Sequence, residues 1–489
     1  MVSKLYFGII SASLSARCDA LFAASLGRIT VFPGDDAYDE SRNTFYSQGN
    51  HNLELNCNVQ PTTIKKVSQV IKILGSSSDL TNWDIGVRSG GHSDWNNNAV
   101  YRGVSIDLSK FNQVELTTYS GIPWKQAIEW TGRSAITDVV ARIRPATHWG
   151  DVITYLEPYG VSVTGGRSGH VGVGGLLVAG GASYNIQQWR LSCDNVVNYE
   201  VVLANGNVVQ ANRFVNGDLF KVLKGGGNNL GIVTRFDMRT FTVPPQGAYG
   251  GLAFSPFSSI DANIDSGPPG HQFLVYRYDG PKGGYGLMNM MVSTDGKNNS
   301  SNFADFGSKI PLSIVQSISD AGGSYYHSAT LSIQPSEAML QKSAEILQTL
   351  VDAAQKAGST ATFNFVHQPL PKMLASVNPG GNILGLDQTL RTNQVLFEAR
   401  ATTPAADGAA KNAIMDSLLL KAVEELRQFS ASQPNHSTYV YMNYASPTQN
   451  VLESYGASNV AYLRRVAGKY DPTGFFQTRV PGGWKIGRF

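Results

Sequence analysis

The stretch that most constrains this chain is RSGGHS, at Arg88–Ser93. It follows the apolar run Trp83–Val87, which is typical of a short buried strand. Two adjacent glycines, Gly90 and Gly91, let the backbone turn tightly and approach a bound molecule closely. The next residue, His92, then stands where that molecule would lie. The stretch therefore predicts a ligand-binding turn at the end of a strand.

Two further glycine-rich stretches share this chemistry, at Gly165–Gly181 and Gly225–Gly231. Glycine leaves backbone N–H groups open to a ligand, so three such loops predict a large phosphate-bearing cofactor. None of them is a dinucleotide fingerprint, because no GxGxxG opens a helix after a first strand with an acidic residue beyond it. NAD is therefore not indicated.

Composition and charge exclude several classes of function. The chain has 489 residues, of which 42% are hydrophobic and 15% charged, as expected of a folded globular protein. Its formal net charge is +3 without a basic run, which argues against a nucleic-acid partner. No later apolar run approaches the ~18 residues that span a membrane, so no membrane partner is expected. No metal site is predicted.

The N-terminus resembles a secretory signal. Met1–Lys4 carries a positive charge, Leu5–Leu14 is apolar, and small residues precede a cleavage position near Ala16. An ordinary buried helix start is the alternative. We expect residues 1–16 to be a signal peptide and the protein to be secreted or in the secretory pathway. Glycosylation triplets that fit secretion stand at Asn298, Asn299 and Asn435.

The chain has three cysteines, so at least one is unpaired. If the chain is secreted, Cys18 and Cys57 are the natural disulfide pair, which would tie the mature N-terminus to the first domain. Cys193 then stays free as a small buried hydrophobic residue. Without secretion all three would be thiols.

The elements expected along the chain fall into two groups. Up to Phe241 they are mixed, with an irregular stretch at 28–56, helices at 62–74, 149–159 and 218–223, strands at 103–108, 136–143, 161–164 and 232–241, and a hairpin at 196–211. Beyond Pro244-Pro245 strands predominate, joined by helices at 335–357 and 404–429, with a last helix at 460–470. These strands are expected at 249–254, 273–278, 287–293, 324–333, 360–366, 394–400 and 438–444. The pattern predicts an α+β fold in which an antiparallel sheet is backed by helices.

Seven ordered motifs resemble the berberine-bridge-enzyme-like flavoproteins, in the vanillyl-alcohol-oxidase class with the PCMH-type FAD fold. The motifs are RSGGHS at 88–93, VGVGG at 171–175, AGG at 179–181, CDNVVNYEVVLANG at 193–206, DLFKVLKGGGNNLGIVTRF at 218–236, YMNYASP at 441–447 and YDPTGFFQ at 470–477. The resemblance covers nearly the whole chain, and its details look fungal. It implies a PCMH-type FAD-binding domain at 17–243, a substrate domain with an antiparallel sheet at 244–444, and a C-terminal segment, 445–489, that returns to the FAD domain.

The resemblance implies an FAD bonded covalently to His92. Many relatives add a second bond from a cysteine, but Ser168 occupies that position here and serine cannot form the thioether, so a single link is expected. Gly165–Gly175 should hold the pyrophosphate through backbone N–H groups. The residues expected to bind the cofactor are Arg88, Ser89, Gly90, Gly91, His92, Ser93, Gly165, Gly166, Ser168, Val171, Gly172, Val173, Gly174, Gly175, Gly231, Ile232, Val233 and Asn443.

Tyr444 matches the family tyrosine that acts as the catalytic base, and Tyr441 is the second choice. A free tyrosine has a pKa near 10, so a cation or hydrogen-bond donor must lower it, and the sequence does not name that donor. A cross-strand aromatic pair without chemistry is the alternative. Val171 matches a position that gates oxygen at the flavin, and a small branched residue there resembles the oxidases.

We therefore expect a monomeric FAD-dependent oxidase that moves hydride from a small alcohol or secondary metabolite to the flavin and reduces O₂ to H₂O₂. Oxidative cyclisation of the product is an extension of that chemistry. A carbohydrate oxidase of the same fold is one alternative, and a flavin-retaining protein without turnover is another. The unusual region 117–147, in which Thr117–Ile136 looks like inserted sequence, favours the latter.

Overall fold

The computed structural model describes residues 16–76, 83–94, 97–118, 138–243, 247–255, 270–294, 308–310, 322–376 and 381–487. The expected signal peptide, most of the unusual segment at 117–136, the Pro244-Pro245 boundary and the triplets at Asn298 and Asn299 lie outside these residues. Where the chain is described, mixed α and β structure with antiparallel sheets is observed, so the expected α+β class is confirmed.

The RSGGHS turn follows an edge strand of a small N-terminal sheet. The sheet has the order β1-β2-β4-β3, and β4 pairs in parallel with both β2 and β3. Helix α4 packs on it through a buried face that includes Val67 and Ile71, and the Thr63 side chain caps its first turn. The bounds are Thr30–Val31 for β1, Cys57–Val59 for β2, Ile64–Gly75 for α4, Ile85–Arg88 for β3 and Val104–Asp107 for β4.

A second, antiparallel sheet has the order β5-β6-β10-β8-β9. The expected hairpin is its β8–β9 pair, which turns at Gly206 with a φ of +76°. The strands are Val114–Thr118 (β5), Val139–Ile143 (β6), Val196–Val202 (β8), Val208–Asn212 (β9) and Ile232–Arg239 (β10). A two-stranded sheet joins Val161–Ser162 (β7) to Phe241–Thr242 (β11). The helices of this region are Trp149–Leu156 (α6), Val173–Val178 (α7), Ile186–Trp189 (α8), Gly217–Leu223 (α9) and Ala457–Tyr470 (α15).

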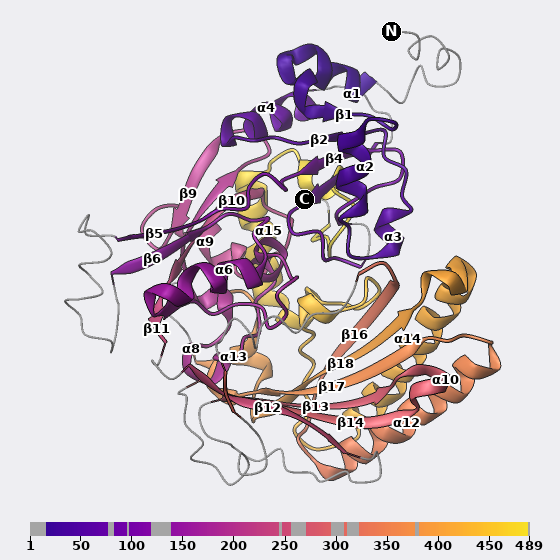
Figure 1. The fold of residues 1–489 in the computed structure, drawn as a ribbon. Helices are drawn as coiled ribbons and strands as arrows, with labels where there is room; N and C mark the ends of the chain where they lie inside the picture. Colours follow the sequence, from indigo (N-terminus) through magenta and orange to yellow (C-terminus); the bar gives the residue numbers. More distant parts are fainter. Residues whose placement is uncertain are drawn as a thin grey trace.

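The third sheet has seven strands in the order β15-β12-β14-β13-β17-β18-β16, all paired antiparallel. Two long helices, α12 and α14, cover one of its faces (Figure 1), and alternate residues such as Phe365 and Phe397 form a core with them. The other face is turned toward the N-terminal half. The bounds are Ala248–Ser255 (β12), Gly270–Tyr278 (β13), Tyr285–Ser293 (β14), Ser308–Ile310 (β15), Tyr325–Ile333 (β16), Glu337–Lys356 (α12), Thr362–Leu370 (β17), Gln394–Thr403 (β18) and Gly408–Ala431 (α14).

Three expectations were wrong. The stretch 438–444 is not a strand, because it pairs with no other segment and ends in a 3-10 turn at Met442–Tyr444. The stretch 28–56 is not wholly irregular, since it contains helices at Asp36–Asn43 (α2) and Gln48–His51 (α3). Pro335 lies before helix α12 rather than in its first turn, and the Ser336 side chain caps that helix.

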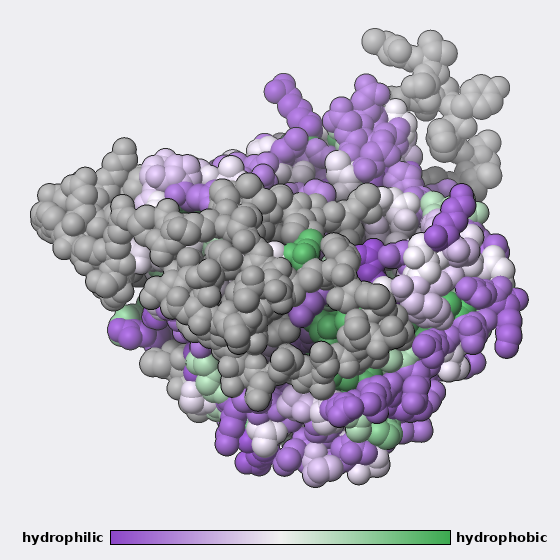
Figure 2. Space-filling model, turned by 60° about the horizontal axis from the view of Figure 1, so that its bottom comes forward, coloured by the Kyte–Doolittle hydropathy of each residue, from purple (hydrophilic) through white to green (hydrophobic). Residues whose placement is uncertain are grey.

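The cysteine predictions are confirmed. Cys18 and Cys57 form a disulfide with their Cα atoms 6.0 Å apart, and Cys193 is free and buried. Among the coloured residues of the face in Figure 2, hydrophilic ones predominate, with small hydrophobic patches between them. Of the helices that the structure describes, none combines the length and the apolar character needed to cross a membrane.

Candidate active site

The first two predicted glycine loops lie against each other. A Cβ atom added to Gly90 would stand 2.4 Å from the Cα of Gly172, and one added to Gly172 would stand 2.6 Å from the Cα of Gly90. Only two glycines permit this approach. The imidazole of His148 joins the same contact, since its Nε2 lies 3.1 Å from the carbonyl oxygen of Gly90.

The start of helix α6 holds the second glycine-rich stretch, Gly165–Gly181, through backbone hydrogen bonds. The Trp149 amide donates to the Val171 carbonyl at 3.0 Å, and the Val173 amide donates to the Thr147 carbonyl at 3.0 Å. A Cβ on Gly165 or Gly166 would come within 2.2 or 2.4 Å of the Trp149 indole, so both positions require glycine. The third loop is near as well, because the amides of Gly225 and Gly227 donate to the last residue of α7, Val178, at 3.1 and 3.0 Å.

Four predicted cofactor residues lie at strand ends, where their contacts are with the protein itself. Gly231, Ile232 and Val233 lie where β10 begins, and the last two pair with Val202 and Val201 of β8. The buried Arg88 guanidinium turns behind the RSGGHS loop, donating to Ser41 and Thr44 and pairing with Asp107 at 3.5 Å. Arg88 thereby holds the loop, whereas its contact with a cofactor stays a prediction.

His92 is held in place from one side by an aromatic ring. Its imidazole stacks on the Tyr46 ring, with ring centroids 3.9 Å apart and planes 15° apart. Tyr46 and Gly90 also border a cavity of about 500 Å³ that His148 and His170 line. Ser93 is fixed through its carbonyl, which accepts from the Asn50 side chain at 2.8 Å.

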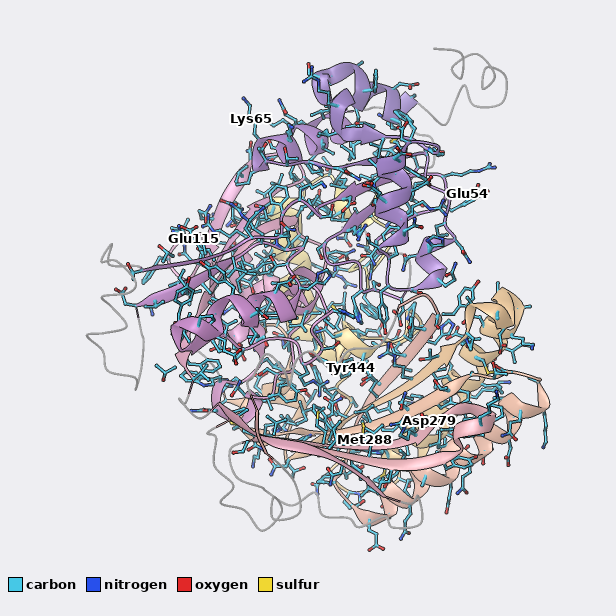
Figure 3. All side chains as sticks on the ribbon, viewed as in Figure 1. Glu54, Lys65, Glu115, Asp279, Met288 and Tyr444 are labelled. Carbon is cyan, nitrogen blue, oxygen red and sulfur yellow. A yellow bond between two sulfur atoms is a disulfide. The ribbon has the colours of Figure 1, made fainter. Side chains whose placement is uncertain are left out.

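Tyr444 belongs to a cluster that joins three distant segments. Arg167, from the second glycine loop, donates to the Tyr444 hydroxyl and to the side-chain oxygen of Gln368 on β17. The Arg167 guanidinium also lies 4.2 Å from the Phe273 ring centroid. Figure 3 shows Tyr444 between the seven-stranded sheet and the N-terminal half. The donor that the sequence left unnamed is therefore present, and it is Arg167.

The pKa of Tyr444 is raised by burial, and the Arg167 cation opposes this rise more than any other group. The Glu398 carboxylate raises the same pKa further, while the Arg400 cation lowers it. Arg167 and Glu398 thus act on Tyr444 in opposite directions, which makes its proton affinity sensitive to both.

Tyr441 is tied into the backbone instead. Its hydroxyl accepts from the Ala182 amide at 2.6 Å and from the Asn443 side chain at 3.0 Å, and burial raises its pKa. Asn443 also donates to the Leu176 carbonyl at 3.2 Å, which links the 3-10 turn to α7. These contacts favour Tyr444 over Tyr441 as the group that exchanges a proton.

The open face of the seven-stranded sheet carries residues that sequence reasoning missed. On β17 and β18, Gln368, Glu398 and Arg400 alternate with residues of the helix-covered core. On β13 and β14 the same face is apolar, with Phe273, Val275, Met288 and Met290 (Figure 3 labels Met288). The alternation of Glu398 and Arg400 with Phe397 and Ala399 was the signal that could have found the polar half.

The residues around these loops fit an FAD. The glycines leave backbone surface bare, and two buried hydroxyls beside the loops, those of Thr164 and Ser192, have no hydrogen-bond partner in the part of the chain that the structure describes. Buried hydroxyls normally have partners, so polar atoms of a cofactor would suit them. The same described residues contain no group of three His, Cys, Asp or Glu side chains that could hold a metal ion.

Comparisons with known proteins agree with this reading. The FAD binding domain family matches residues 56–212. The FAD-dependent monooxygenase drtC of Aspergillus calidoustus is 30% identical over 96% of this chain and 90% of its own, and sdcF of Emericella nidulans is 31% identical over 98% and 100%.

Solved structures share the fold. Xylooligosaccharide oxidase from Myceliophthora thermophila, in complex with xylobiose, matches with a TM-score of 0.72 at 18% identity over 97% of this chain and 100% of its own. Berberine bridge enzyme from Eschscholzia californica matches with a TM-score of 0.72 at 14% identity over 97% and 100%. The fold is thus the PCMH-type FAD-binding fold with an antiparallel sheet, and the chain belongs to the family of FAD-dependent oxidoreductases that includes drtC and sdcF.

Proposed function

We propose that this protein is an FAD-dependent oxidase that converts a small alcohol or secondary metabolite to its carbonyl and reduces O₂ to H₂O₂. The observation that carries the proposal is the Arg167–Tyr444 pair beside the open face of the substrate sheet. A phenol next to a guanidinium is suited to accept a proton, because the cation stabilises the phenolate.

The chemistry assigns separate tasks to the two partners. FAD, when bound, accepts hydride from the substrate and passes two electrons to O₂. Tyr444, as phenolate, takes the proton of the substrate hydroxyl at its Oη, and the adjacent C–H bond supplies the hydride. The apolar residues around Met288 and Met290 exclude water from this region, and a carbonyl made there is open to internal attack, which gives oxidative cyclisation.

The proposal includes a single covalent link between the flavin and His92, since Ser168 cannot supply a second. It also includes a monomer that passes through the secretory pathway. The Cys18–Cys57 disulfide and the exposed position of Asn435 support this route. Acid-denatured protein should keep its yellow colour, and His92→Ala should lose it; flavin that washes away from the wild type would contradict the link.

Oxidase function can be tested before the substrate is known. We would reduce the bound flavin with dithionite under nitrogen, remove the excess, mix with oxygenated buffer and follow the return of flavin absorbance together with H₂O₂. An oxidase returns one H₂O₂ per flavin. Val171→Leu should slow reoxidation about tenfold, which corresponds to about 1.4 kcal/mol of barrier. If the flavin of the wild type were reoxidised slowly, at the rate expected for Val171→Leu, the oxidase proposal would be contradicted.

A second candidate is oxygen insertion, which the names of the fungal relatives favour, since drtC and sdcF are both called FAD-dependent monooxygenases. The two functions differ in where the oxygen goes. In a screen of aromatic alcohols, phenols and oligosaccharides under ¹⁸O₂, an oxidase places the label in H₂O₂, whereas a monooxygenase places one atom in the product. Turnover of oligosaccharides alone would favour a carbohydrate oxidase, and an absence of turnover with every class would favour a flavin-retaining protein.

A further inference from the structure

Three side chains form a column that ends on His92. The Tyr46 ring stacks on the imidazole at 3.9 Å and 15°, and on the Tyr326 ring at 4.3 Å and 19°. Two partners at stacking distance, each nearly parallel to Tyr46, must lie on its opposite faces. Arg400 lies beside both tyrosine rings, because its guanidinium carbon is 4.8 Å from the Tyr326 ring centroid and 5.8 Å from the Tyr46 ring centroid, and it donates to the Tyr46 hydroxyl.

The backbone fixes this column to the RSGGHS loop. The Tyr46 amide donates to the carbonyl of Gly91, the residue before His92, at 3.2 Å. The Tyr46 carbonyl accepts from the Gly323 amide at 3.0 Å, just before strand β16, which carries Tyr326. Tyr46 is therefore held to the loop on one side and to the seven-stranded sheet on the other, and the whole residue is only 9% exposed, which leaves its ring little freedom to move.

We propose that Tyr46 is a positioning residue for the covalent attachment of the flavin, an inference that rests on the proposed His92 link. The imidazole must present one nitrogen to a flavin methyl carbon, and an unrestrained histidine turns about two side-chain bonds. Stacking on Tyr46 fixes the plane of the imidazole ring. Holding two reacting groups in a fixed orientation increases the rate of the reaction between them.

The bond-forming step balances with O₂ as the oxidant. One hydrogen leaves the flavin methyl group and one leaves the imidazole N–H, while the new C–N bond forms between them. The two protons and two electrons pass to O₂ and give one H₂O₂. Tyr46 is not consumed and exchanges no proton, so its contribution is the ring and not the hydroxyl.

The test compares linking rates in four proteins: wild type, Tyr46→Phe, Tyr46→Met and Tyr325→Met. Methionine fills the space without a flat ring, and phenylalanine keeps the ring but loses the hydroxyl. Tyr325 is a matched control, because it is a similarly buried tyrosine next to Tyr326 whose hydroxyl accepts from Asn52 at 2.9 Å. Each protein is isolated without flavin, given FAD in air, and sampled over time for flavin that stays with acid-precipitated protein.

We expect Tyr46→Met to bind FAD but to link it about tenfold more slowly or worse, with Tyr46→Phe and Tyr325→Met close to wild type. Equal linking rates in Tyr46→Met and Tyr325→Met would overturn the inference. A wild type that binds FAD but never links it would instead overturn the His92 proposal. If Tyr46→Met does not fold, Tyr326→Met removes the support behind the ring: slower linking supports the column, and an unchanged rate overturns it.

Discussion

Replacing Arg167 with methionine should move the pH dependence of flavin reduction to higher pH. The Arg167 guanidinium carbon lies 5.9 Å from the Tyr444 ring centroid. Two unit charges at that separation interact by about 3 kcal/mol at an effective dielectric constant of about 20. At 1.36 kcal/mol for each tenfold change in an equilibrium constant, and with solvent at the partly exposed phenol weakening the interaction, loss of Arg167 should lower the phenolate population at a fixed pH by about tenfold to a hundredfold.

The direction follows from the charge of the base. Arg167 lowers the pKa of Tyr444, so its loss raises that pKa and leaves less phenolate at any pH below it. The rising limb of log kcat/KM against pH should therefore move to higher pH, with activity lost at neutral pH and recovered at alkaline pH. Anaerobic stopped-flow reduction of the flavin, with the best substrate from the screen, measures the limb directly.

Arg167→Lys is the control, since it keeps the charge but loses the flat fork that contacts both Tyr444 and Gln368. Its limb should lie between those of the wild type and Arg167→Met. The reasoning would be refuted if Arg167→Met lowered the rate of flavin reduction without moving the rising limb of the pH profile. Arg167 would then position the substrate, and Tyr444 would not be the titrating base.

Three other outcomes are expected. Gly90→Ala should lose bound flavin and lower the melting temperature, because its Cβ would collide with the Gly172 backbone. Gly217→Ala, whose Cβ meets only the Asn212 carbonyl oxygen at 3.8 Å, should keep both the flavin and the melting temperature, and visible absorbance and thermal melting measure the two properties. Burial lowers the pKa of His367 to about 4, so the unfolded chain binds the extra proton as pH falls below about 6.5, and about 3 kcal/mol of stability should disappear between pH 6.5 and 4. His367→Gln should flatten that loss in urea titrations. Cys57→Ser opens a disulfide that spans 39 positions and should cost about 2–4 kcal/mol in unfolding free energy, with an unchanged midpoint contradicting this.

Local pattern was enough to predict most of the elements. Helix α12 lies within its expected range, 335–357, and is followed by Gly358 with a left-handed φ of +68°. The β8–β9 pair forms the expected hairpin at 196–211. The strand prediction for 438–444 was wrong because side chains alternate there between buried and less buried positions although the backbone pairs with no strand. Tyr439 and Tyr441 are both buried in the core around β8 and β10, yet the amide of Val440 between them donates to the Ser454 side chain rather than to a neighbouring strand.

The sequence predicted only part of the candidate site. Contiguous motifs revealed the glycine loops and Tyr444, because their residues stand together in the chain. Arg167 could not be assigned to Tyr444, since 277 positions separate them, and Tyr46 lies 354 positions from Arg400. Contacts of this range come from the packing of the substrate sheet against the loops, which no local pattern encodes.

The division of the sheet's open face has a consequence for how this enzyme can change. The residues of the sheet that act on the pKa of Tyr444, Gln368, Glu398 and Arg400, lie on β17 and β18, whereas β13 and β14 contribute the apolar side chains around Met288 and Met290. Substitutions at Met288 or Met290 can therefore reshape the substrate that is accepted while the acid–base machinery keeps its own tuning. In such a fold, substitutions on β13 and β14 can change the substrate while the residues that act on Tyr444 stay the same.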